Sequence, residues 1–216
     1  MKRATVMKSP FVLAILVVTT GLGSMSQSGC ATPRPSHHLV QAERRVDSRL
    51  ARELTEKGLV AFDTGDLAEA ERLFREAVDV DVAFGPAHNN LGKVYFELEK
   101  MYLAAWEFEY AIKLMPHHPG PRNNLGLVLE TAYRYDESVD VYEQALEITP
   151  DDPEIIGNLV RARIRRGDRL TGLKPLLEHL VLTAHRPEWR AWGEEQLARA
   201  KREEPGSAAL TPAVTP

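Results

Sequence analysis

The chain has 216 residues, of which 44% are hydrophobic and 27% charged, and this is the composition of a globular protein of one or two domains. Its formal net charge of −4 disfavours nucleic acid or another polyanion as a partner. The single cysteine, Cys30, excludes a disulfide within one chain. Composition therefore indicates an ordinary folded protein and does not by itself indicate a reaction.

Residues 1–29 have the pattern of an export signal. Three basic residues precede an apolar run from Phe11 to Val18. The run is too short to span a bilayer as a mature helix. The stretch Ser28-Gly29-Cys30 resembles the end of a bacterial lipoprotein signal. That resemblance implies cleavage before Cys30 and attachment of lipid to its sulfur.

The neighbours of Cys30 refine this prediction and leave alternatives. Lipoprotein signals prefer Leu three places before the cysteine, where this chain has Gln27. An ordinary secretory signal is therefore one alternative, and an uncleaved anchor is another. Ala31 follows the cysteine, and by the same resemblance it favours the outer membrane of a two-membrane bacterium. Residues 30–36 contain two prolines and are predicted to form an extended, lipid-anchored tether.

A 34-residue pattern is written three times between residues 51 and 152. A strict period of this length indicates a solenoid of stacked supersecondary units, because one helix pair cannot bury its apolar face alone. The small residues predict a close approach of two antiparallel helices, with an aromatic ring beside the contact. The recurring residues are Gly58, Gly92 and Gly126; Ala70, Ala104 and Ser138; Phe74, Phe108 and Tyr142; and Ala77, Ala111 and Ala145.

The second and third copies carry the fullest set of motif residues. These are Asn90-Leu91-Gly92, Tyr95, Ala104, Phe108, Ala111 and Pro116, and then Asn124-Leu125-Gly126, Ser138, Tyr142, Ala145 and Pro150. With these residues the segment resembles the tetratricopeptide repeat family. The resemblance implies an all-α fold, a right-handed superhelical stack of antiparallel helix pairs whose concave face binds other proteins. It implies no reaction.

Further helices are predicted on both sides of the three clear copies. Apolar residues at helical spacing from Leu39 to Leu50 predict a helix from about residue 38 that runs into the first copy or breaks near 50. Pro175 predicts that the second helix of a degenerate fourth copy starts late or kinks. Pro187 is expected to open a capping helix. The expected parts are a repeat domain at 37–186 with copies at about 51–84, 85–118, 119–152 and 153–186, a capping helix at 187–203, and a disordered tail at 204–216.

The first helix of each copy has a face that points away from the packing columns, and in the family this face lines the concave groove. Positions 5, 9 and 12 share it because they are spaced four and three. Amides there are expected to hydrogen-bond a partner's backbone, while apolar residues bury its side chains. The alternative is that another segment covers this face, or that its residues pack locally. The candidate partner-binding residues are Leu59, Phe62, Asn89, Lys93, Phe96, Asn123, Leu127, Glu130, Arg161, Ile164 and Arg165.

Some relatives in this family hold a C-terminal carboxylate with Lys, Asn and Arg at set groove positions. Asn90 fits that scheme. Thr55, Leu59 and Gly120 occupy other places that the scheme needs filled. We therefore do not expect binding of a chaperone tail.

No catalytic or metal-binding constellation is found in the sequence. The carboxylates are interpreted as solvated helix surface, and a glycine-rich phosphate loop is missing. His117 and His118 are interpreted as polar residues of an inter-repeat turn, because no zinc spacing accompanies them. Arg161 and Arg165 are four residues apart, and we weigh a shared anion site against a solvated surface. We expect no catalytic residue, metal or cofactor.

These patterns predict a lipid-anchored scaffold of the bacterial cell envelope, placed on the outer membrane and facing the periplasm. Its expected partners are proteins or peptides, in pilus, secretion or cell-wall assembly, and the membrane through the lipid on Cys30. Nucleic acid and a small-molecule substrate are not expected. One alternative is a soluble periplasmic or secreted binding protein without lipid. Another is a non-catalytic subunit of an envelope enzyme.

Overall fold

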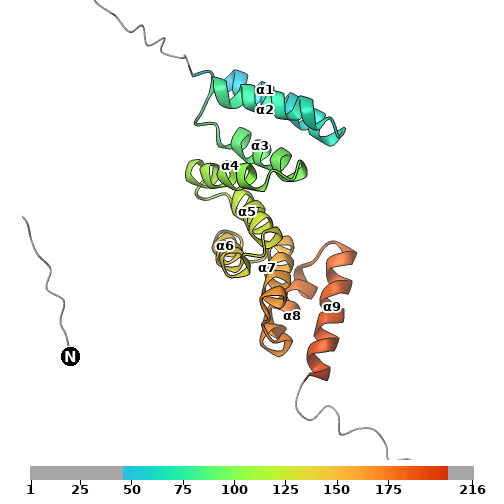
Figure 1. The fold of residues 1–216 in the computed structure, drawn as a ribbon. Coiled ribbons are helices and arrows are strands. Elements are labelled where there is room, and N and C mark those ends of the chain that lie inside the picture. Colours follow the sequence, from blue (N-terminus) through green and yellow to red (C-terminus); the bar gives the residue numbers. More distant parts are fainter. Residues whose placement is uncertain (1–45, 204–216) are drawn as a thin grey trace, which may run out of the picture. The chain divides into compact units, whose positions relative to one another are not determined.

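The computed structural model describes residues 46–203, which form helices and short turns and, within that range, no strand (Figure 1). These residues belong to one compact unit, Glu43–Pro216. The predicted export signal, tether and tail lie outside the described residues. The helices are α1 (Ser48–Asp63), α2 (Leu67–Val80), α3 (Gly85–Glu97), α4 (Met101–Leu114), α5 (Pro119–Thr131), α6 (Tyr135–Ile148), α7 (Pro153–Arg166), η1 (Leu170–Leu173), α8 (Lys174–Thr183) and α9 (Pro187–Arg202).

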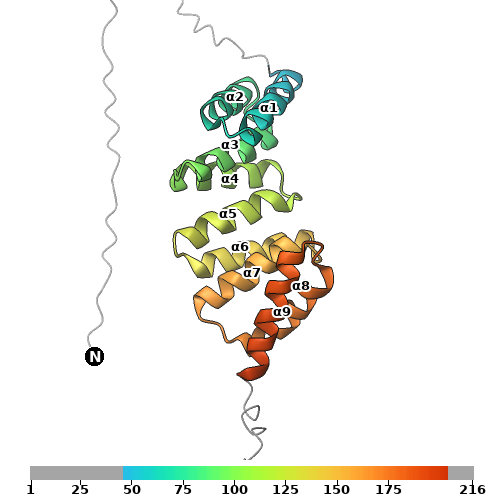
Figure 2. The same ribbon diagram turned by 90° about the vertical axis from the view of Figure 1, so that its right-hand side faces the viewer.

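The helices pack in chain order, each against the next, as Figure 2 shows for the run from α1 to α9. The first helices of the pairs also contact one another: α1 touches α3, α3 touches α5, and α5 touches α7. The predicted all-α stack of antiparallel helix pairs is thereby confirmed. Because the first helices adjoin, their side chains form one continuous surface.

The glycine and aromatic columns hold each pair together. A Cβ atom placed on Gly58 would lie 2.6 Å from the Phe74 ring, and one on Gly92 would lie 2.7 Å from the Phe108 ring. Gly126 meets the Tyr142 ring in the same way. The aromatic residue therefore lies directly on the glycine, and only a residue without a side chain lets the helices approach so closely.

Side-chain caps and prolines fix where the helices begin. The Asp47 carboxylate accepts a hydrogen bond from the Leu50 amide at 2.9 Å, so α1 starts at Ser48. Val46 and Asp47 are not helical. A helix from residue 38 therefore does not run unbroken into the first copy, and the part of that predicted helix before Val46 lies outside the described residues.

The fourth copy departs from the pattern where Pro175 falls. A short 3₁₀ turn, η1, replaces the start of the second helix, and α8 begins only at Lys174 with the proline in its first turn. Pro187 then opens α9, whose Trp189, Trp192 and Leu197 pack on the core of the fourth copy. Across residues 46–203, no helix is both long and apolar enough to cross a membrane.

Candidate partner-binding groove

An apolar cavity of about 220 Å³ lies on the surface of the first helices. Phe62 of α1, Phe96 of α3 and Leu127 of α5 line it, and all three were predicted from their repeat positions. Phe108 of α4 also lines it. Each of the three predicted residues is only partly buried, packed on the core from one side. The cavity can therefore accept an apolar side chain from a partner.

A second cavity of about 370 Å³ adjoins the first and is mainly polar. Lys93 and Asn124 line both cavities, so the two form one continuous depression, which we call the groove. Asn89 and Asn123 contribute amides to the polar part, and His118 lines its edge. An apolar pocket beside a row of amides suits a peptide that buries one side chain and hydrogen-bonds through its backbone.

The amides of neighbouring copies are hydrogen-bonded to one another. Asn124 donates to Asn89 at 3.0 Å, and Asn158 donates to Asn123 at 2.9 Å. Each pair joins position 6 of one copy to position 5 of the copy before. Asn89 and Asn124 are only partly buried, and their bond uses only part of their hydrogen-bonding capacity, so their remaining groups can face a ligand.

In the first copy this pairing is interrupted. Thr55 stands at position 5, and its hydroxyl donates to the Ala51 carbonyl within α1 at 2.8 Å. The Asn90 side chain is nevertheless largely buried. The amide row therefore begins at α3 and not at α1, a detail that the sequence pattern did not show.

Three of the predicted groove residues form an internal ion cluster. The Glu130 carboxylate is only 3% exposed and accepts two hydrogen bonds from Arg161, at 2.9 and 3.1 Å. Arg165 approaches the same carboxylate at 2.8 Å, and the Tyr142 hydroxyl donates to it at 3.3 Å. The anion that Arg161 and Arg165 share is thus a residue of the protein itself.

The environment of this cluster shifts two pKa values. Burial disfavours the charge on Arg161, but the hydrogen bonds and negative charge of Glu130 outweigh it and raise the pKa of the guanidinium. Burial, together with the charge of Glu130, raises the pKa of Tyr142. Both groups therefore keep their protons over the physiological range.

Helix α9 covers the end of this surface. Gly157 holds position 5 of the fourth copy, and its missing side chain is replaced by the Trp189 ring, which lies against it. The Arg161 guanidinium lies 5.9 Å from the centre of the same ring. Ile164 packs on the core of the fourth copy. In the fourth copy another segment, α9, therefore covers the face that was predicted to line the groove. The open groove lies over α1, α3 and α5.

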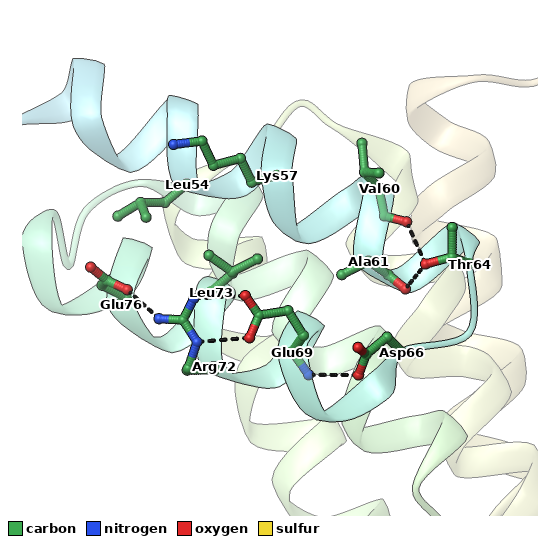
Figure 3. A pocket seen from close by; sticks show the side chains of 10 residues that line it. All are labelled: Leu54, Lys57, Val60, Ala61, Thr64, Asp66, Glu69, Arg72, Leu73 and Glu76. Atoms are coloured by element: carbon green, nitrogen blue, oxygen red, sulfur yellow. Dashed lines mark hydrogen bonds and ion pairs between the residues drawn. The ribbon is translucent and has the colours of Figure 1, made fainter.

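A cavity of about 610 Å³ lies at the other end, on α1 and α2 (Figure 3). Leu54 and Leu73 form its apolar part. Figure 3 shows Arg72 bonded to both Glu69 and Glu76, so its charge is already compensated. Both helices belong to the first copy, and within residues 46–203 no helix precedes α1. We therefore interpret this surface as the uncovered end of the stack.

A buried histidine and glutamate pair was not predicted from the sequence. His88 is 1% exposed, and its Nδ1 lies 2.7 Å from the Glu107 carboxylate. Its Nε2 lies 2.9 Å from the Val82 carbonyl oxygen. Each ring nitrogen thus faces an oxygen, so the ring is held from both sides. The pair joins α3 to α4.

Helix pairs that stack in series and carry a groove on their first helices define a helical-repeat binding protein. Residues 55–119 and residues 122–149 each match a family model described as tetratricopeptide repeat. These two segments are therefore similar to tetratricopeptide repeats. The motif residues of the second and third copies had indicated a resemblance to the same family.

Similar proteins include the human Cell division cycle protein 16 homolog, 29% identical over 106 residues, which are 45% of this chain and 17% of that protein. Hsp70-Hsp90 organizing protein 1 of Glycine max is 25% identical over 134 residues, 60% of this chain and 23% of that protein. The chain spans less than a quarter of the length of these relatives. A solved structure, the first TPR of Spaghetti (RPAP3) bound to HSP90 peptide SRMEEVD, is 25% identical with a TM-score of 0.56 and covers 57% of this chain and 98% of that one.

Proposed function

We propose that this protein is a scaffold that binds an extended peptide segment of another protein in the groove over α1, α3 and α5. The apolar cavity takes one large side chain of that segment, and the amide row holds its backbone. The observation that carries the proposal is that the two cavities share Lys93 and Asn124 and so form one site. A role as a protein-interaction scaffold is also in keeping with the repeats and relatives described above.

The chemistry of the groove distinguishes its ligand from the acidic chaperone peptide. Lys93 is the predicted groove cation that carries no ion pair within residues 46–203, whereas Arg161 and Arg165 are both bound to Glu130. Asp152 and Glu154 line the polar cavity and oppose a ligand rich in carboxylates. We therefore expect the preferred peptide to carry a large apolar residue and little negative charge, unlike SRMEEVD.

A peptide display screen against the full chain tests this proposal. Selected peptides should share one large apolar residue, and they should bind at least about tenfold more tightly than SRMEEVD in fluorescence anisotropy. Leu127→Asp puts a charge into the apolar cavity and should abolish binding of the selected peptides. Leu182→Asp, on an exposed site of α8, is the matched control and should leave binding unchanged. Peptides that bind equally well to both variants would show that the groove is not the site.

We further propose that lipid on Cys30 tethers the scaffold to the bacterial cell envelope, at the outer membrane. The support is the sequence pattern of residues 1–30, since these residues lie outside the described range. Mass spectrometry of the mature N-terminus should find a lipidated Cys30, and Cys30→Ala should move the protein from the membrane to the soluble fraction. An unmodified, cleaved N-terminus would favour the soluble periplasmic or secreted alternative.

A further inference from the structure

The outer face of α4 carries a stripe of apolar residues. Tyr102, Trp106 and Tyr110 follow one another at intervals of four, and Leu103 lies three residues before Trp106, so all four share one face of the helix. Tyr102 is 82% exposed, Trp106 51% and Leu103 41%, while Tyr110 is partly buried. We call these four residues the α4 stripe.

The other helix pairs show that this stripe is not a packing requirement of the fold. The corresponding residues are Ala68, Glu69, Arg72 and Glu76 in α2, and Asp136, Glu137, Asp140 and Gln144 in α6. Both sets are polar apart from one alanine, as expected for a solvated helix face. The same backbone position thus tolerates charge twice and carries aromatic residues once. The stripe therefore serves something other than the stability of the stack.

The stripe is ordered into a flat surface. The Trp106 and Tyr110 rings stack, with centres 5.7 Å apart and planes only 13° from parallel. The Tyr110 ring in turn lies 4.6 Å from the buried His88 ring, which is fixed by hydrogen bonds on both sides. Helix α4 packs against α3 and α5 (Figures 1 and 2), and within residues 46–203 no helix covers the stripe. The stripe is a rigid apolar surface that needs a partner.

We propose that the α4 stripe is the contact between two copies of this chain, in which α4 of one copy lies antiparallel to α4 of the other with Trp106 at the two-fold axis. The three aromatic residues of the stripe are placed symmetrically about Trp106, because Tyr102 and Tyr110 lie four residues to either side. An antiparallel pairing centred there places each Tyr102 against Tyr110 of the second copy. A self-complementary surface of this kind is what a two-fold interface requires.

The charges that border the stripe fit the same symmetry. Glu99 and Lys113 lie seven residues before and after Trp106, and both are exposed. Glu99 lies in the turn just before α4 and Lys113 in its last turn, so the antiparallel pairing brings the end of one α4 that carries Glu99 to the end of the other that carries Lys113, twice. Parallel α4 helices would instead bring like charges together. Opposite charges at the rim select the partner and its orientation more than they add affinity.

The size of the stripe suits a dimer of ordinary strength. Aromatic side chains bury about 150–250 Å² each, so the exposed parts of the stripe offer on the order of 400 Å² in each copy. A polar rim of similar extent brings two copies into the range of about 1,200–2,000 Å² that specific interfaces bury. Apolar residues at the centre and charges at the edge match the usual arrangement of such interfaces.

Sedimentation equilibrium of the full chain, with reductant present so that Cys30 stays reduced, tests the proposal. The wild type should reach twice the monomer mass as its concentration rises. Tyr102→Glu should weaken the association by about tenfold or more, because it buries a charge at the interface. Ala68→Glu makes the same change at the equivalent position of α2 and should leave the association unchanged. A monomer at every concentration, or a dimer that both variants retain, would overturn the proposal.

A charge exchange then tests the antiparallel register. Glu99→Lys and Lys113→Glu should each weaken the dimer, because each places like charges opposite one another. The double variant restores opposite charges and should recover the wild-type association. Loss of association that the double variant fails to recover would rule out the pairing about Trp106. Peptide binding in the groove should be unaffected by all of these changes, so this proposal and the proposed function can fail separately.

Discussion

Arg161 of α7 grips Glu130 of α5 with two parallel hydrogen bonds, from Nε to Oε1 at 2.9 Å and from Nη2 to Oε2 at 3.1 Å. The carboxylate is almost fully buried, whereas the guanidinium is partly exposed. Planar bidentate pairs of this kind fix both distance and orientation. The pair therefore sets how the fourth copy sits on the third.

Removing this guanidinium should destabilise the protein. Arg161→Met keeps the side-chain length but leaves the buried Glu130 with only Arg165 and Tyr142 as partners. We expect a loss of about 1–3 kcal/mol in the free energy of unfolding, measured by urea denaturation. Arg165→Met is the control, and since Arg165 is half exposed its loss should stay within about 1 kcal/mol. Equal losses of unfolding free energy for the two variants would mean that the bidentate contact of Arg161 stabilises the protein no more than the contact of Arg165.

Filling the glycine column should also destabilise the stack. Gly126→Leu forces the Tyr142 ring away from the helix, and we expect a cost of about 1–3 kcal/mol. Gly172→Leu is the matched control, since a Cβ atom at Gly172 would meet nothing within 4 Å. Thermal unfolding followed by circular dichroism would compare the two. An unchanged melting temperature for Gly126→Leu would refute the close contact.

The raised pKa of Tyr142 predicts a loss of stability in alkali. The folded protein holds this proton more tightly than the unfolded chain does. Its contribution to stability is therefore complete below the unfolded pKa of about 10 and declines as the pH rises from there toward the folded pKa. Between about pH 9 and about pH 11 the wild type should lose roughly 1 kcal/mol more than Tyr142→Phe, as urea denaturation would show. Tyr133→Phe, at an exposed site, should follow the wild type.

The hydrogen bonds of the amide row should contribute most to the stability of the fold where the amides are buried. Asn158 donates to Asn123 and accepts from Arg161 at 2.8 Å, so Asn158→Leu removes both hydrogen bonds, leaves the Asn123 oxygen without this donor and should cost about 1–3 kcal/mol. Asn90 holds the same repeat position in α3, but Thr55, the residue at the position equivalent to Asn123, bonds within its own helix. Asn90→Leu should therefore cost clearly less. A similar loss for both variants in chemical denaturation would argue against the row as a stabilising feature.

Much of the fold was predictable because residues that recur at the same position in every copy indicate the same contact in every copy. The spacing of Gly58, Gly92 and Gly126 indicated a close helix contact, and the structure shows an aromatic ring on each glycine. The apolar cavity was also within reach, since Phe62, Phe96 and Leu127 share one helix face by spacing alone.

Contacts between copies could not be predicted in the same way. Glu130 and Arg161 are 31 residues apart, and no local pattern distinguishes a carboxylate that is buried by a neighbour from one in water. Trp189 on Gly157 depends on the path of the chain after α8, which the motif does not specify. The His88 and Glu107 pair likewise joins residues of different helices whose pairing only the packing decides.

The position of Trp189 limits what the protein can hold. Its indole lies on Gly157, which holds position 5 of the fourth copy, so the amides at position 5 end at Asn123. In the proposed groove, a bound strand that extends past Leu127 would find no further amide at position 5. Helix α9 thus limits the length of peptide that the proposed groove can bind. Lengthening a ligand beyond this point should add little to its affinity.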